Sequence, residues 1–132
     1  MKTTILLTTI YLLFTINCFS QPKTDTLTVA ISETESDSVD LNGLDLLAIQ
    51  FPATMTSDTV FIQDKNLKTG TFQDVYYTSS EGEVIRTHIV VQAGAKVFIN
   101  PMMTFGLGRY ARFVTIDAEA AARGLISFKG HR

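Results

Sequence analysis

The chain has little of the raw material from which disulfide-rich domains and zinc sites are built. It contains one cysteine, no tryptophan and two histidines in 132 residues. A single cysteine cannot form an intrachain disulfide, so a disulfide framework is excluded. Structural zinc needs about four converging nitrogen or sulfur ligands, and the sequence shows no such grouping. A hydrophobic core must therefore stabilise the fold, and a hydrophobic content of 45% is sufficient for one domain.

An excess of basic side chains is also missing. The 11 Lys and Arg residues are outnumbered by 13 Asp and Glu residues, for a formal net charge of −2. Surfaces that bind nucleic acid normally carry a basic excess on one face, and a polybasic contact with anionic lipid needs clustered Lys and Arg. The charge therefore argues against a nucleic-acid partner and against such a membrane contact.

The first twenty residues differ in composition from the rest. Lys2 precedes an almost uncharged apolar run at residues 5–16, and the small residue Ser20 follows. This order is typical of a secretory signal peptide. The run is also shorter than the roughly 20 residues that a membrane-spanning helix needs. We expect residues 1–20 to be removed on export.

Other fates for this segment remain open. It can be a retained anchor or an N-terminal strand. Cys18 also permits lipidation, although Asn17 fits poorly before a lipid-modified cysteine.

Downstream, short β-prone runs alternate with turn residues. Leu27, Val29 and Ile31 fall on one face of a period-two pattern. Asn42-Gly43 predicts a tight turn, because both residue types tolerate positive φ. The expected strands are residues 27–32, 39–41, 44–51, 59–63, 71–78, 84–91, 96–99, 110–116 and 124–129.

This spacing predicts an all-β fold, an antiparallel β-sandwich of about eight strands that is jelly-roll-like. We divide the chain into residues 1–20, a polar lead-in with the first strand at 21–37, and a sandwich core of one domain at 38–132. Residues 101–108 are expected to be a loop over the end of the core, and 117–122 a helical turn or bulged loop. Core side chains expected to meet between the layers include Ile49, Phe61, Ile89 and Phe113.

Histidine chemistry finds little support in the sequence. His88 falls on the polar face of its strand, and His131 belongs to a C-terminal tail. A serine or cysteine nucleophile needs an oriented base, and no motif places either histidine near one. We expect no catalytic residues, no cofactor and no enzyme activity.

Carboxylates are more numerous. Asp37, Asp40 and Asp45 fall in an acidic stretch with Glu33 and Glu35. Calcium takes several oxygen ligands from such loops, so the three aspartates are candidate ligands, but their spacing fits no EF-hand loop. A solvated acidic loop is the favoured interpretation, and a small hydrolase that uses these acids is the least favoured function.

Two further patterns have alternative interpretations. Residues 106–111 match a glycine-rich dinucleotide motif, but a strand rather than a helix follows, which indicates a turn. Tyr76, Tyr77 and Tyr110 can stack on sugars if they are exposed. Alternation, however, places at least one of the adjacent pair Tyr76 and Tyr77 in the core.

The stretch from residue 38 to about 129 resembles small virion structural proteins of tailed phages and prophages. The segments that carry the resemblance are 38–43 (SVDLNG), 48–53 (AIQFPA), 59–63 (TVFIQ), 70–76 (GTFQDVY) and 109–114 (RYARFV). The resemblance implies a jelly-roll-like sandwich acting as a capsid decoration, a head fibre or a similar accessory. It transfers no catalytic residue. A signal-like N-terminus departs from this pattern, because phage virion proteins assemble in the cytoplasm.

Two functions follow as expectations. The first is a non-enzymatic virion structural protein whose partners are other virion proteins or copies of itself, a trimer being one closed form. The alternative is an exported β-sandwich binding module with a glycan partner, located in the periplasm, at the cell surface or outside the cell. No individual binding residue can be assigned from the sequence.

Overall fold

The structure is a computed structural model that describes residues 21–104 and 106–131. The signal-like segment, including Cys18, lies outside these residues. The described elements, in chain order, are β1 (Lys23–Val29), β2 (Val39–Asp40), β3 (Asp45–Gln50), β4 (Thr59–Lys65), β5 (Gln73–Asp74), β6 (Tyr76–Thr78), β7 (Val84–Arg86), β8 (His88–Val90), β9 (Lys96–Phe98), α2 (Pro101–Thr104), β10 (Tyr110–Thr115) and β11 (Arg123–Gly130).

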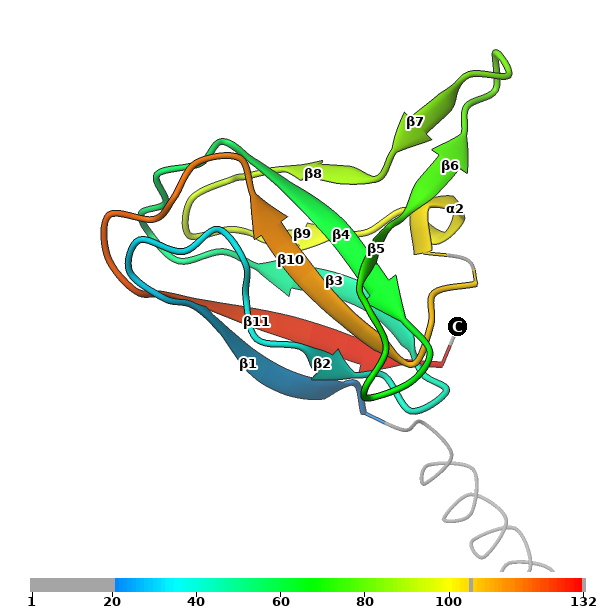
Figure 1. The fold of residues 1–132 in the computed structure, drawn as a ribbon, viewed down its shortest axis with the longest axis horizontal. Helices are drawn as coiled ribbons and strands as arrows, with labels where there is room; N and C mark the ends of the chain where they lie inside the picture. The colour runs from blue at the N-terminus through cyan, green and yellow to red at the C-terminus, as the bar shows by residue number, and fades with distance from the viewer. Residues whose placement is uncertain (1–20, 105, 132) are drawn as a thin grey trace, which may run out of the picture.

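The strands form two antiparallel sheets that lie in separate layers (Figure 1). Sheet A has the order β1-β11-β3-β9. Sheet B has the order β2-β10-β4-β5, and β8 also pairs with β4. β6 and β7 pair only with each other. The predicted all-β, antiparallel fold class is confirmed.

The hydrophobic core lies between the two sheets. Sheet A contributes Leu27 and Ile49, and sheet B contributes Ile62, Ile89 and Phe113. Burying one such side chain stabilises the fold by roughly 1.5–3 kcal/mol. The remaining buried members of the cluster are Val29, Val39, Leu41, Leu46, Phe51, Val60, Ile99, Ala111 and Leu125.

Period-two patterning fails at two predicted core positions. Ile31 is exposed, because β1 ends at Val29 and the chain turns away. Phe61 lies on the outer face of sheet B, because its neighbours Val60 and Ile62 both point into the core. Three consecutive apolar residues left the inward face of this strand ambiguous, and the structure shows that it is not the face of Phe61.

A β-bulge changes the expected faces of β3. Ala48 pairs with Phe128 and Leu46 with Lys129, so Leu47 has no opposite residue on β11. The extra residue brings Leu46 into the core cluster, whereas Leu47 is only half-buried. The bulge therefore places Leu46, rather than Leu47, on the inward side together with Ile49.

The expected strands 71–78 and 84–91 each divide in two, because the edge of β4 changes partner at Ile62. The Ile62 amide donates to the Thr87 carbonyl (3.2 Å), and the Ile62 carbonyl accepts from the Val75 amide (3.2 Å). β8 pairs with β4 before this point and β5 pairs with it afterwards. Beyond Val75 and Thr87 the two strands pair only with each other, as the β6–β7 arm, residues 76–86, which projects from the sandwich (Figure 1).

The arm explains why neither adjacent tyrosine is in the core. Tyr76 is exposed and Tyr77 is half-buried, contrary to the prediction that one of them packs inside. Within the part of the chain that the structure describes, this hairpin pairs with neither sheet of the sandwich, because the two strands separate from β4 before either tyrosine occurs.

The tight turn at Asn42-Gly43 was predicted correctly. Asn42 and Gly43 both have positive φ, at 48° and 79°, and the Leu44 amide donates to the Leu41 carbonyl (2.9 Å). This is the predicted tight turn. By contrast, the expected loop at 101–108 begins as the short helix α2, and the polar lead-in is shorter than expected because β1 begins at Lys23.

The side chain of Glu119 joins separate loops at one end of the sandwich. It is buried, and its carboxylate accepts hydrogen bonds from the backbone amides of Thr56 (2.9 Å) and Ser57 (3.3 Å). Arg123 lies 3.4 Å away through Nε. The Glu119 carbonyl also accepts from the Ser32 amide (2.9 Å). Burial raises the pKa of Glu119, but the hydrogen bonds from Thr56, Ser57 and Arg123 outweigh it and hold that pKa below its ordinary value.

We expect Glu119→Gln to lower the free energy of unfolding by about 2 kcal/mol, because an amide replaces a buried, hydrogen-bonded carboxylate. Since the folded-state pKa is depressed, the stabilisation is fully present above the unfolded pKa, roughly 4.3, and is lost as the pH falls through the folded pKa. Urea unfolding at neutral and acidic pH measures both effects. The exposed carboxylate variant Glu33→Gln is the control and should change stability by less than about 0.5 kcal/mol. Equal stability of Glu119→Gln and wild type at neutral pH would contradict this role.

Candidate functional site

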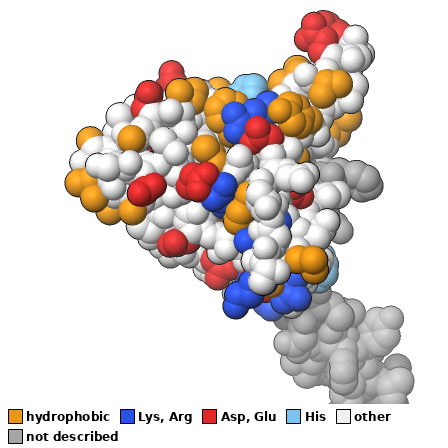
Figure 2. All heavy atoms as spheres, in the orientation of Figure 1, with side chains coloured by type: hydrophobic (Ala, Val, Ile, Leu, Met, Phe, Trp, Pro, Cys, Tyr) orange, Lys and Arg blue, Asp and Glu red, His pale blue; other side chains and the backbone are white. Residues whose placement is uncertain are grey.

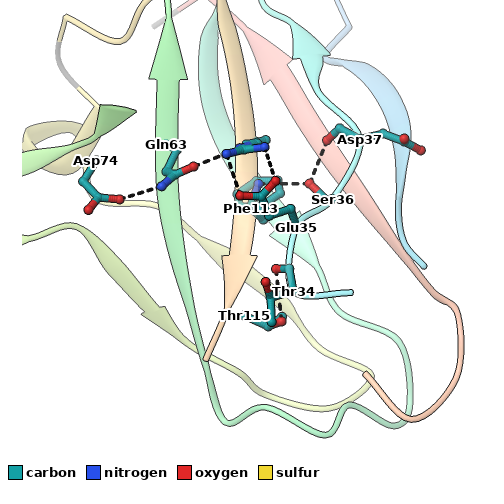
Figure 3. Close-up of polar contacts among 9 residues, drawn as sticks. Thr34, Glu35, Ser36, Asp37, Gln63, Asp74, Phe113 and Thr115 are labelled. Atoms are coloured by element: carbon teal, nitrogen blue, oxygen red, sulfur yellow. Dashed lines mark hydrogen bonds and ion pairs between the residues drawn. The ribbon is translucent and has the colours of Figure 1, made fainter. Parts of the chain in front are cut away.

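The outer face of sheet B carries a continuous row of polar contacts, and Figure 3 shows the part of it from Glu35 to Asp74. We call it the outer ladder, and its members are Glu35, Arg112, Gln63, Asp74 and Arg86. Arg112 donates through its two Nη atoms to the carboxylate of Glu35 (2.5 and 2.7 Å) and through Nε to Oε1 of Gln63 (2.9 Å). Gln63 donates to Asp74 (2.8 Å), which also accepts from Arg86 (2.5 Å).

Aromatic rings support both cations of this ladder. The Arg112 guanidinium lies 4.3 Å from the ring centroid of Phe72, and the Arg86 guanidinium lies 3.9 Å from that of Phe61. In Figure 2, acidic, basic and hydrophobic side chains lie side by side on this face. Each of the two arginines is thus held by a carboxylate and a ring, an arrangement that fixes its side chain.

The three candidate calcium ligands do not form a cluster. Asp40 binds Arg109 through both carboxylate oxygens (3.0 Å each), and the hydrogen bond from Arg109 holds the pKa of Asp40 below its usual range. Asp37 lies in the exposed loop before β2, and Asp45 begins β3. Within residues 21–104 and 106–131, no three His, Asp or Glu side chains are grouped so that they could hold a metal ion. The calcium hypothesis remains a prediction without a grouped site to support it.

The histidines are also separated. His88 lies in β8, with Nδ1 3.1 Å from the Arg86 carbonyl oxygen and its ring 6.2 Å from that of Phe61. His131 is exposed after β11. The glycine-rich stretch leads directly into β10, as expected for a turn. A side chain at Gly108 would approach the backbone of Lys65 to 2.7 Å, so this glycine serves close strand packing.

A second surface lies where the sandwich is open, between β8 and β9. These consecutive strands belong to different sheets, and within the described residues each pairs with one strand only, β8 with β4 and β9 with β3. A hollow of about 300 Å³ lies there, lined by residues that include His88, Val90, Val97, Phe98, Asn100 and Met103. We call it the open-edge groove.

The groove is apolar and has an extension. Val90 and Phe98 are 60% and 76% exposed. A second hollow of about 340 Å³ shares Asn100 and Met103 with the first and continues past Met102 along residues 77–80 of the β6–β7 arm. Exposed apolar surface of this extent is typical of contact sites.

On the groove side of β9, no strand among the described residues pairs with its backbone. The amides of Phe51 and Ile99 bond across β3 and β9, to the carbonyls of Ala95 (3.0 Å) and Leu47 (3.0 Å). Alternation then turns the amide and carbonyl of Phe98 away from β3, toward the open side. Exposed strand edges of this kind can accept an added strand from a partner.

Sequence patterning did not identify this surface. Val90 and Phe98 read as ordinary members of apolar strands, and Met102 as part of a loop over the core. The exposure of these side chains depends on which strands form the edges of the sheets. The one sequence feature that indicates an edge strand here is the short length of the predicted strand 96–99.

We expect Arg112→Met to lower the free energy of unfolding by about 1 kcal/mol, because the variant loses the contacts to Glu35 and Gln63 and leaves both acceptors without that donor. Arg109→Met, which removes a more exposed bidentate pair with Asp40, should cost less. Urea unfolding of both variants makes the comparison. A larger loss for Arg109→Met would contradict a supporting role for the outer ladder.

No protein-family model matches the chain, and no curated protein matches it. Among the described residues, no helix has the length and apolar character to cross a membrane. Among solved structures, the chain is similar in fold to the SPBc2 prophage-derived protein YomS, with a TM-score of 0.51 and 11% sequence identity. The alignment covers 85% of this chain and 97% of that one, so the likeness extends over nearly the whole of both folds.

Proposed function

We propose that the protein is a non-enzymatic structural or accessory protein of a phage virion, an assembly module that docks onto a larger particle through the open-edge groove. The observation that carries this proposal is the similarity in fold to a prophage-derived protein over 97% of that protein's length. Capsid decoration and head fibre are the two forms of this role that suit a small sandwich, and the virion is the location that both require.

The arrangement of charged groups supports the non-enzymatic part of the proposal. The Arg112 and Arg86 side chains of the outer ladder are held by carboxylates and rings, and Asp40 is held by Arg109. General acid–base catalysis needs a group that can exchange a proton with a substrate, with a pKa near the working pH. Charged side chains that are paired with one another in this way favour a role in stabilising the fold over a role in catalysis.

The open-edge groove supports the docking part. It combines exposed apolar side chains at Val90, Phe98 and Met102 with the unpaired edge of β9. An assembly contact of this composition gains affinity both from apolar burial and from main-chain hydrogen bonds. A particle protein that supplies an extended strand is the partner chemistry that fits both features.

We expect the chain to be present in phage particles purified from the strain that encodes it, and the double variant Val90→Ser, Phe98→Ser to be depleted from them at least about tenfold, because exposed apolar anchors carry much of a docking energy. Ile31→Ser, Ile116→Ser is the matched control, since both side chains are exposed away from the groove. Quantitative mass spectrometry of banded particles gives the ratio. Particles that lack the wild-type chain, or that take up both double variants equally, would refute the docking role.

Exposed Tyr76 on the projecting arm favours a second candidate, an exported module that binds carbohydrate. If this function is correct, the full chain should give signals on a glycan array that Tyr76→Ala lowers by at least about tenfold, since stacking on an aromatic face supplies much of sugar affinity. Tyr110→Ala, in the half-buried β10 position, is the comparison variant. An array without signal in the presence and absence of calcium would remove this candidate.

A further inference from the structure

The tip of the β6–β7 arm is a negatively charged projection. Residues 79–83 form its turn, and Glu81 and Glu83 are both exposed there without an ion pair to the rest of the described chain. Val84, immediately after them, is 71% exposed. Figure 2 shows acidic side chains at the tip and no basic ones beside them. The tip therefore presents two carboxylates followed by an uncovered apolar side chain.

The opposite end of the molecule carries positively charged side chains. Lys65 ends β4, Lys68 lies in the turn between β4 and β5, and Figure 2 shows basic side chains gathered at this end. The Lys65 ammonium donates to the Lys68 carbonyl (2.9 Å) and lies 4.2 Å from the ring centroid of Phe72, but it forms no ion pair with a described carboxylate. Lys68 is exposed and forms no ion pair with the described residues, and Leu67 beside it is 70% exposed. A hollow of about 230 Å³ opens at this turn, lined by Asp64, Lys65, Leu67 and Gly70 among others, and the Asp64 carboxylate accepts a hydrogen bond from the Gly108 amide.

The two ends lie at opposite extremes of the fold. The chain runs from the basic turn through β5 and β6 to the acidic tip, and Figure 1 shows the turn and the tip pointing in opposite directions. One molecule therefore cannot bring its own tip to its own turn, but a second copy can.

We propose that copies of this chain associate head to tail, with the acidic arm tip of one copy seated against the basic β4–β5 turn of the next. Glu81 and Glu83 meet Lys65 and Lys68, and Val84 covers Leu67. Opposite charges steer the two surfaces together and fix their register, while the apolar pair loses its exposure to water.

This contact joins two different surfaces, so it is a heterologous interface. Such interfaces close into rings when the rotation between copies allows it and otherwise extend as filaments. A ring or a filament of a small sandwich module is an assembly of the kind that the proposed function requires, so the inference deepens that function by naming one partner as a second copy. The contact leaves the open-edge groove available for a different protein.

The test uses sedimentation velocity of the full chain at low and physiological ionic strength. The screening length falls from roughly 30 Å at 0.01 M salt to about 8 Å at 0.15 M, so an association driven by these charges should weaken as salt is added. We expect Glu81→Lys, Glu83→Lys to weaken self-association at least about tenfold at low salt, and Lys68→Glu to weaken it by a smaller factor. Glu33→Lys, Asp58→Lys is the control, since it changes the net charge by the same amount at exposed positions away from the arm.

A variant in which the charges of the two surfaces are exchanged within one chain gives the decisive measurement. Glu81→Lys, Glu83→Lys combined with Lys68→Glu, Lys65→Glu in one chain should associate again, because the complementary charges are exchanged rather than removed. Circular dichroism of each variant shows whether the fold is retained, and the triple variant Glu81→Lys, Glu83→Lys, Lys68→Glu replaces the four-fold variant if Lys65→Glu unfolds the turn. A wild-type chain that stays monomeric at low salt, or an association that the arm variant and the control weaken equally, overturns the inference. Virion incorporation of a monomeric chain would leave the proposed function standing while the head-to-tail contact fails.

Discussion

The change of partner along the edge of β4 determines what the rest of the molecule can present. At Ile62 the strand exchanges β8 for β5, with the amide bonded to Thr87 and the carbonyl to Val75. Because both neighbouring strands are released from the sheet there, they continue as the projecting β6–β7 arm. For the same reason β8 is a short edge strand of sheet B, which among the described residues pairs with β4 alone. The arm and the open-edge groove are thus two consequences of one set of backbone hydrogen bonds.

The groups that stabilise this fold and the groups that it leaves exposed lie in different parts of the molecule. The inward faces of both sheets and the Glu119 carboxylate hold the layers and the loops together. The outer ladder stiffens sheet B by pairing Arg112 with Glu35 and stacking it on Phe72. The exposed groups include apolar side chains at the groove, Val90 and Phe98 among them, and charged side chains at the two ends. The proposal that the domain assembles with other proteins rests on this division.

The sequence predicted the fold class well, because period two and turn residues are local signals. Ile49, Ile89 and Phe113 were placed correctly in the core, and Asn42-Gly43 was correctly predicted as a turn. Phe61 was placed wrongly because Val60 and Ile62 compete for the same inward face. The bulge at Leu47 and the departure of the arm have no local signature, since each depends on a partner strand far away in the sequence. The candidate docking surface was not predictable for that reason: exposure of Phe98 follows from sheet order, and sheet order is a property of the whole chain.

Amide hydrogen exchange, compared between the free protein and the protein on its particle, addresses most directly whether the open edges are contact surfaces. If the particle covers the groove, the amides of β8 and β9 that face the open side, Val90 and Phe98 among them, should exchange more slowly by at least about tenfold in the bound state. Amides of the central strand β11 should be unchanged, because they are already protected between β1 and β3. Equal exchange at Val90 and Phe98 in the free and bound protein would show that these edges stay open to water and that docking uses another surface.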